Sequence, residues 1–147
     1  MIFGLLALIA AAIFGGVALH VNIVEQPARL SLDDRAPLAE WKPSYKRGAA
    51  MQAPLALVGF LLGMLAWWQT SHAGFLIGAL LILAPWPWTL IVIKPTNDAL
   101  LATNPDQAGP QTRSLIQRWG VVHGVRTVLG ALATAAFLWA CIQNSIV

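Results

Sequence analysis

Three side chains of this sequence have the types needed for acid–base chemistry: the carboxylate of Glu25, the imidazole of His123 and the guanidinium of Arg126. A histidine and a carboxylate can move protons, and an arginine stabilises a developing anion. Each lies within or at the end of an apolar segment, where ionisable residues indicate a functional site. Asn97, at the end of another apolar segment, is the fourth candidate catalytic residue. A buried salt-bridge network that only fixes helix packing is the competing interpretation.

The spacing places these side chains on packed helix faces. Small and polar residues at steps of three and four form one stripe on each of two segments: Ala11, Gly15, Ala18, Asn22, Glu25 and Arg29 in the first, and Trp119, His123, Arg126, Gly130, Ala133 and Phe137 in the last. Because small residues on a membrane helix mark close helix contacts, both stripes should face the bundle interior. We therefore predict an ion pair between Glu25 and Arg126.

Cofactor binding is left open by the residue types. Glu25 and His123 are the only metal ligands we can nominate, and two ligands are too few to define a site. The single cysteine, Cys141, excludes a disulfide within the chain. A bis-histidine haem would have to use His20 and His123, but His20 lies about 200° around its helix from Asn22, which argues against haem. Cofactor-free chemistry and a bound metal ion both remain compatible with the sequence.

The elements that must position these residues are predicted from the charge pattern. All nine Lys and Arg and all six Asp and Glu fall within residues 25–47 and 94–126 of the 147-residue chain. Such confinement is typical of a membrane protein, because a charge at the bilayer centre costs about 2.5–3.5 kcal/mol. Four apolar segments of spanning length are predicted: about Ile2–Val24, Ala49–Gln69, Gly74–Ile93 and Gly120–Ile142. The fold class is therefore all-α, a single integral membrane domain (1–147) forming a four-transmembrane-helix bundle.

The same pattern predicts the orientation of the bundle. Both charged segments lie on one side, and the positive-inside rule makes that side the cytoplasm, with both termini outside. We expect a bacterial inner-membrane protein with an ordered polar cap formed by the 1–2 and 3–4 loops. The start, Met1–Gly4, carries no basic residue, so we expect a retained span rather than a signal peptide. Pro85 and Pro87 predict a kink or break in the third helix.

Several short motifs together resemble the anthrone oxygenase-like family of small membrane proteins, known by the domain of unknown function DUF1772. They are Val24–Arg29, Trp41–Gly48, Trp86–Leu90, Pro95–Asn97 and Trp119–Arg126, in this order. The fourth-helix pattern, Arg118 and Trp119 followed by His123 and Arg126, is the most specific of them. The resemblance covers nearly the whole chain.

The resemblance implies oxidation of an anthrone to an anthraquinone with dioxygen. His123 or Glu25 would remove the proton from the activated carbon, and Arg126, Arg29 and Asn97 would stabilise the enolate. Trp41, Tyr45 and Trp119 would line an aromatic pocket, with Asn22 pointing toward it. The implied substrate is a lipophilic aromatic compound of anthrone or quinol type, reached from the cytoplasmic leaflet.

Other functions remain open at this point. A non-enzymatic membrane binding or assembly subunit, with a purely structural polar cluster, is the main alternative to an oxidoreductase. Transport is less favoured because charge lies on one side only. The basic residues all flank membrane segments, so we expect the lipid bilayer and a small molecule as partners and no nucleic acid. Small-residue faces permit a homo-oligomer without requiring one.

Overall fold

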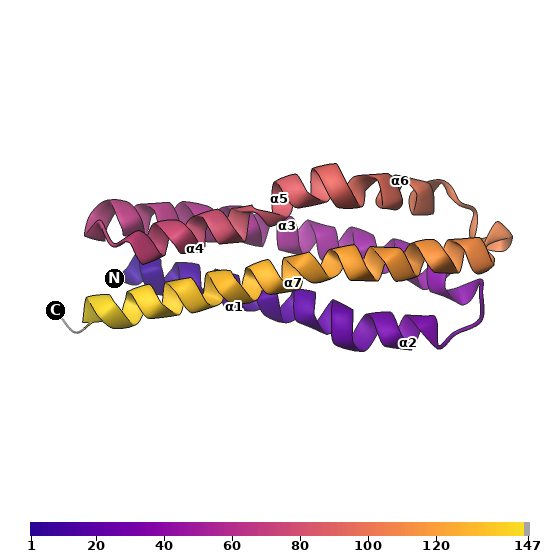
Figure 1. Cartoon of the computed structure of the whole chain (residues 1–147), viewed down its shortest axis with the longest axis horizontal. Helices are drawn as coiled ribbons and strands as arrows, with labels where there is room; N and C mark the ends of the chain where they lie inside the picture. Colours follow the sequence, from indigo (N-terminus) through magenta and orange to yellow (C-terminus); the bar gives the residue numbers. More distant parts are fainter. Residues whose placement is uncertain (146–147) are drawn as a thin grey trace.

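The computed structural model describes residues 1–145, which form four long helical segments in an antiparallel bundle (Figure 1). The predicted all-α, four-helix fold class is confirmed, and residues 1–145 contain no strand. The first segment consists of α1 (Ile2–His20), the π-helical turn η1 (Val21–Glu25) and α2 (Gln26–Leu30), and the second is α3 (Ala36–Thr70). The third consists of α4 (Ala73–Leu83), α5 (Pro85–Trp88), the π-helical turn η2 (Thr89–Ile93) and α6 (Lys94–Ala102). A 3₁₀ turn, η3 (Pro105–Gln107), leads into the fourth, α7 (Pro110–Ser145).

All four segments are long and apolar enough to cross a membrane, and each is longer than the apolar stretch predicted for it. They contain 29 to 36 residues, whereas about 20 are enough to span a bilayer. The predicted second span begins near Ala49, but α3 begins at Ala36 and continues through Pro43. A proline inside a helix costs about 3 kcal/mol, and the complete burial of Leu38 and Trp41 offsets that cost.

The polar end of the bundle is therefore built from helix extensions joined by two short connections, 31–35 and 103–109. In the first connection, Asp33 Oδ1 accepts hydrogen bonds from the backbone N–H groups of Ala36 and Arg35, at 2.9 and 3.0 Å. These bonds lower the pKa of the Asp33 carboxyl and help to start α3.

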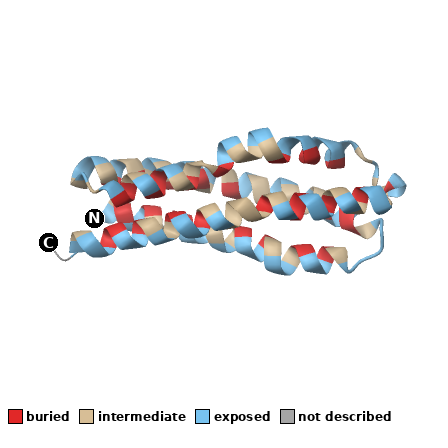
Figure 2. Cartoon of the chain, in the orientation of Figure 1, coloured by how far each residue is buried: buried red, intermediate tan, exposed pale blue. Residues whose placement is uncertain are grey.

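The opposite, apolar half is held together by small residues that let the helices approach closely. Figure 2 shows the buried residues on the inward faces of each helix. Phe137 of α7 is completely buried and lies against Gly63 of α3 and Gly78 of α4. Where α1 crosses α7, a Cβ added to Gly130 would lie 2.8 Å from Gly15 Cα. This crossing leaves no room for even a methyl group.

The third helical segment is interrupted where the prolines predicted a break. The chain turns at Ala84 between α4 and α5, and Figure 1 shows α5 and α6 displaced sideways from the line of α4. Pro85 and Pro87 lack the N–H groups that would continue the helical hydrogen bonds. The N-terminus and the end of α7 lie together at the apolar end of the bundle, and the two charged connections lie at the other (Figure 1).

Gly130→Ala should lower the thermal stability of the detergent-solubilised protein, by about 1–3 kcal/mol in unfolding free energy, because the methyl group forces α1 and α7 apart. Gly16→Ala is the control, since a Cβ there meets nothing within 4 Å. Equal melting temperatures for the two variants would show that the α1–α7 crossing tolerates separation.

Candidate functional site

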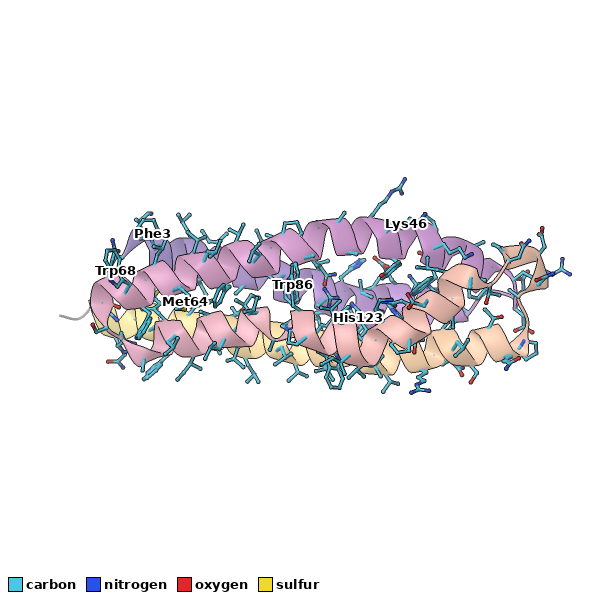
Figure 3. The ribbon with its side chains drawn as sticks, turned by 90° about the horizontal axis from the view of Figure 1, so that it is seen from above. Phe3, Lys46, Met64, Trp68, Trp86 and His123 are labelled. Atoms are coloured by element: carbon cyan, nitrogen blue, oxygen red, sulfur yellow. The ribbon has the colours of Figure 1, made fainter. Side chains whose placement is uncertain are left out.

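The candidate residues gather around α7 in the half of the bundle that carries the charges. Figure 3 shows His123 in this half, far from Phe3, Met64 and Trp68 at the apolar end. Two π-helical turns face this stretch of α7: η1 provides Asn22, which contacts His123, and η2 provides Thr89, which contacts Arg126. Such π-helical turns occur often at functional sites because they redirect side chains locally.

His123 is oriented by Asn22. The imidazole is only 4% exposed, and its Nδ1 lies 2.9 Å from Asn22 Oδ1. Asn22 Nδ2 donates to the Gly120 carbonyl at 2.8 Å, which leaves Oδ1, an atom that only accepts, toward the imidazole. Nδ1 of the neutral ring must then carry the proton, and Nε2 holds the free lone pair. The amide of Asn22, predicted to contact substrate, is thus engaged with α7.

Arg126 has hydrogen-bond partners but no acidic partner. Its Nη2 donates to Gln52 Oε1 at 2.7 Å, and its Nη1 donates to Thr89 Oγ1 at 3.2 Å. Its Nε is buried and has no hydrogen-bond partner within residues 1–145. None of the ion pairs among those residues includes Arg126. The site therefore contains a guanidinium whose charge the described protein leaves unpaired.

The predicted ion pair between Glu25 and Arg126 is wrong. Glu25 Oε2 instead lies 3.3 Å from Arg29 Nη2 and accepts a hydrogen bond from the Ser44 hydroxyl at 2.8 Å. The cause is η1, where buried positions pass from Val21 to Gln26, a step of five residues instead of three or four. Gln26 turns inward and donates to the Ile116 carbonyl, whereas the Glu25 side chain stays 31% exposed.

Arg29 is a structural counterpart to Arg126. It is 2% exposed, and its guanidinium forms ion pairs with Glu40 and Glu25. It also donates to Gln26 Oε1 at 2.7 Å and lies 5.7 Å from the centre of the Trp119 ring. The described protein already uses this guanidinium fully, so Arg29 joins α2 to α3 and α7 and has little capacity left for a ligand.

Four side chains form a continuous polar and aromatic wall next to His123. Trp41 stacks on Tyr45 with ring centres 4.8 Å apart, and the rings of Trp41 and Trp119 are nearly perpendicular with centres 5.7 Å apart. Trp119 Nε1 donates to Asn97 Oδ1 at 2.9 Å, and Asn97 Nδ2 donates to the Tyr45 hydroxyl at 3.3 Å. Asn97 lies within the first turn of α6, which begins at Lys94, so its side chain does not cap that helix.

The site contains two adjoining cavities. The inner chamber has a volume of about 30 Å³, and His123, Asn97 and Trp119 line it. The outer cavity has a volume of about 180 Å³ and lies between α3 and the third helical segment. Five residues line both: Tyr45, Ala49, Gln52, Thr89 and Arg126. Arg126 thus stands where the two cavities meet.

The structure brings together only some of the predicted site residues. His123, Asn97, Arg126, Tyr45 and Trp119 surround the inner chamber. Glu25 lines a neighbouring groove with Glu40 and Arg47, and this groove shares Val21, Ser44 and Gly48 with the inner chamber. Trp41 is completely buried behind Tyr45. Within residues 1–145, no three His, Cys, Asp or Glu side chains come together as potential metal ligands.

Two contributors to the site were missed from the sequence. Gln52 and Thr89 hold the Arg126 guanidinium, and each is a lone polar residue within a charge-free stretch. A glutamine in such a segment has to be paired inside the bundle, because lipid offers it no hydrogen bond. That isolation was the available signal for Gln52.

Comparisons with known proteins agree with the motif pattern. The model of a family described as anthrone oxygenase matches residues 41–136. The chain is 26% identical, over 132 residues, to a protein of Aspergillus fumigatus named anthrone oxygenase tpcL. The match covers 83% of this chain and 82% of that protein. No solved structure matches the chain significantly.

Asn22→Leu should change the tautomer of the neutral His123 ring, because the acceptor that holds the proton on Nδ1 is lost. Nitrogen NMR of ring-labelled histidine should show neutral His123 protonated on Nδ1 in the wild type and mainly on Nε2 in the variant. Asn144→Leu, whose amide bonds only within α7, is the control and should keep the wild-type spectrum. An Nε2–H tautomer in the wild type would contradict the assignment.

Proposed function

The chain belongs to the anthrone oxygenase family, and we propose that it is a membrane oxidoreductase that uses dioxygen to oxidise a flat phenolic ketone of the anthrone type. The reaction takes place where the inner chamber meets the outer cavity. The observation that carries this proposal is the unpaired guanidinium of Arg126.

An unpaired arginine in an apolar bundle is unfavourable unless a ligand supplies the missing counter-charge or hydrogen bonds. Burying a charge costs several kcal/mol when neither a counter-ion nor a full set of hydrogen bonds compensates for it. The outer cavity beside Arg126 is otherwise mainly apolar, with Phe14, Pro85 and Trp86 in its walls. A planar aromatic molecule whose oxygen becomes negatively charged matches both features, since its rings fit the walls and its enolate oxygen pairs with Arg126.

His123 is the base in this proposal. Its Nε2 lone pair is free because Asn22 holds Nδ1–H, and its ring lines the inner chamber one helical turn from Arg126. Nε2 takes a proton from the methylene carbon of the anthrone, and the electron pair moves to the ketone oxygen as an enolate. Arg126 stabilises that oxygen, and the hydroxyl of Tyr45 and the amide of Asn97 form the polar wall beside it.

The atoms and electrons of the proposed reaction balance with dioxygen as the oxidant. The electron-rich enolate reduces dioxygen, and one oxygen atom becomes bonded to the former methylene carbon. That carbon loses both hydrogens and becomes the second carbonyl of the quinone, while the other oxygen atom leaves as water. The carbon is oxidised by four electrons, and dioxygen accepts all four.

The orientation of the bundle is also part of the proposal. The charged end, with all nine Lys and Arg, faces the cytoplasm, and both termini lie on the other side of a bacterial inner membrane. The distribution of basic residues supports this orientation.

Substitution by methionine should lower activity at one arginine and stability at the other. Arg126→Met should lower anthrone oxidation about 100- to 1000-fold, because enolate stabilisation is lost, while the melting temperature stays equal or rises. Arg29→Met should lower the unfolding free energy by about 1–3 kcal/mol, because Glu25 and Glu40 each lose a charged hydrogen-bond donor. Oxygen uptake and thermal melting in detergent measure both effects. A purely structural polar cluster would instead make both variants unstable.

His123→Ala should slow oxygen consumption with anthrone about 100- to 10,000-fold in a protein that stays folded. Under oxygen-18 gas, mass spectrometry of the wild-type product should show one labelled oxygen atom per quinone. His72→Ala, at the opposite end of the bundle, is the control. Undiminished activity in the His123 variant would assign proton removal to another group.

A further inference from the structure

The outer mouth of the 180 Å³ cavity opens toward lipid. Its outer walls include Leu90, which is 60% exposed, and Trp86, which is 40% exposed. Both lie in the charge-free stretch 49–93, on a bundle surface that contacts hydrocarbon when the four helices cross a membrane. The cavity thus connects the bilayer side of the bundle to the Arg126 guanidinium.

Two features of the sequence create this opening. On α3, the small residues Ala49, Ala53 and Ala56 line the cavity at steps of four and three, where larger side chains would fill it. On the facing segment, the chain is displaced at Ala84, so α5 and η2 do not continue the line of α4 (Figure 1). The gap therefore results from the proline break together with a face of alanines.

Access to the chamber from the charged end is obstructed. Leu38, Trp41, Leu100 and Ile116 are all completely buried, and each lies about one or two turns closer to the connections than the chamber residue on the same helix. The remaining opening is the groove lined by Glu25, Glu40 and Arg47. A ligand that used this groove would pass three charged groups, whereas Arg126 is the one charged residue among residues 1–145 that lines the outer cavity.

The indole of Trp86 lies across the lipid-facing opening of the outer cavity. Its ring belongs to α5, and its Nε1 donates to the Ala53 carbonyl of α3 at 3.3 Å. The indole thereby links the two walls of the cavity at its exposed rim. Indoles prefer positions of this kind in membrane proteins, because one part of the ring is apolar and the N–H needs a partner.

We infer that the substrate reaches the site sideways from the bilayer, between α3 and the α5–η2 segment, and that Trp86 selects for flat molecules at this opening. The inference rests on the proposed function and narrows its substrate class. Compounds must dissolve in the membrane as uncharged planar aromatics and lose their proton only inside. Derivatives with a fixed charge, such as sulfonates, are excluded at the mouth.

The test compares alizarin, a phenolic anthraquinone, with its sulfonated form, alizarin red S. Binding to the full chain in nanodiscs is followed by stopped-flow quenching of tryptophan fluorescence. Wild type should bind alizarin and exclude the sulfonate. Ala53→Trp, which plugs the mouth, should slow alizarin association about tenfold relative to Ala50→Trp, since Ala50 is exposed on α3 and does not line the cavity. Trp86→Ala should speed association and dissociation alike.

A second pair of variants tests the opposite wall. Leu90→Trp should slow association, and Leu80→Trp should not, because Leu80 is equally lipid-facing but outside the cavity. Equal association rates within both pairs, or equal rates for alizarin and its sulfonate, would overturn lateral access while leaving the proposed function intact. Alizarin binding that Arg126→Met does not weaken would overturn the proposed function and this inference together.

Discussion

The extra residue in the π-helical turn Val21–Glu25 determines which acidic group meets which arginine. In a regular α-helix, Glu25 would continue the inward face of α1 toward α7. The turn rotates Gln26 inward and leaves Glu25 facing Arg29 and Ser44. Arg29 therefore forms ion pairs with two carboxylates, whereas Arg126 has only the neutral partners Gln52 and Thr89 in the described part of the chain. The difference between an arginine with two carboxylate partners and one with none therefore follows from this single local irregularity.

The two arginines also differ in how the bundle compensates for their burial. Arg29 joins three helical segments at the charged end, where hydrogen bonds to Gln26 and ion pairs to two glutamates compensate for its burial. The bundle can also contain the poorly compensated Arg126, because packing in the apolar half and in the aromatic group around Trp119 stabilises the fold. A binding site usually lowers stability in the free protein, and the surrounding structure has to supply the difference.

Much of the fold could be predicted from charge and spacing, whereas the pairing inside the site could not. The charge-free stretches predicted four membrane-length helices, Pro85 and Pro87 predicted the break, and the α7 stripe placed His123 and Arg126 on one buried face. Helical periodicity, however, assumes 3.6 residues per turn throughout, so it could not reveal η1 or the separation of Glu25 from Arg126. The start of α3 was missed for a related reason, since local propensity disfavours Pro43 and only the tertiary burial of Leu38 and Trp41 compensates for it.

The placement of His123 and Arg126 one turn apart on the same helix has a chemical consequence. A rigid helix keeps the imidazole and the guanidinium at a constant separation, and Asn22 and Gln52 hold these side chains from two other helices. Side-chain order is therefore provided before a ligand arrives, and little reorganisation is needed when charge develops. The outer cavity ends at Arg126, and His123 lines only the inner chamber beyond it. Under the proposed function, the depth to which a flat molecule enters therefore determines which of its atoms reaches the imidazole. With substrate entry as proposed, selectivity would arise mainly from shape and membrane solubility, and the polar groups would act only once the molecule is fully inserted.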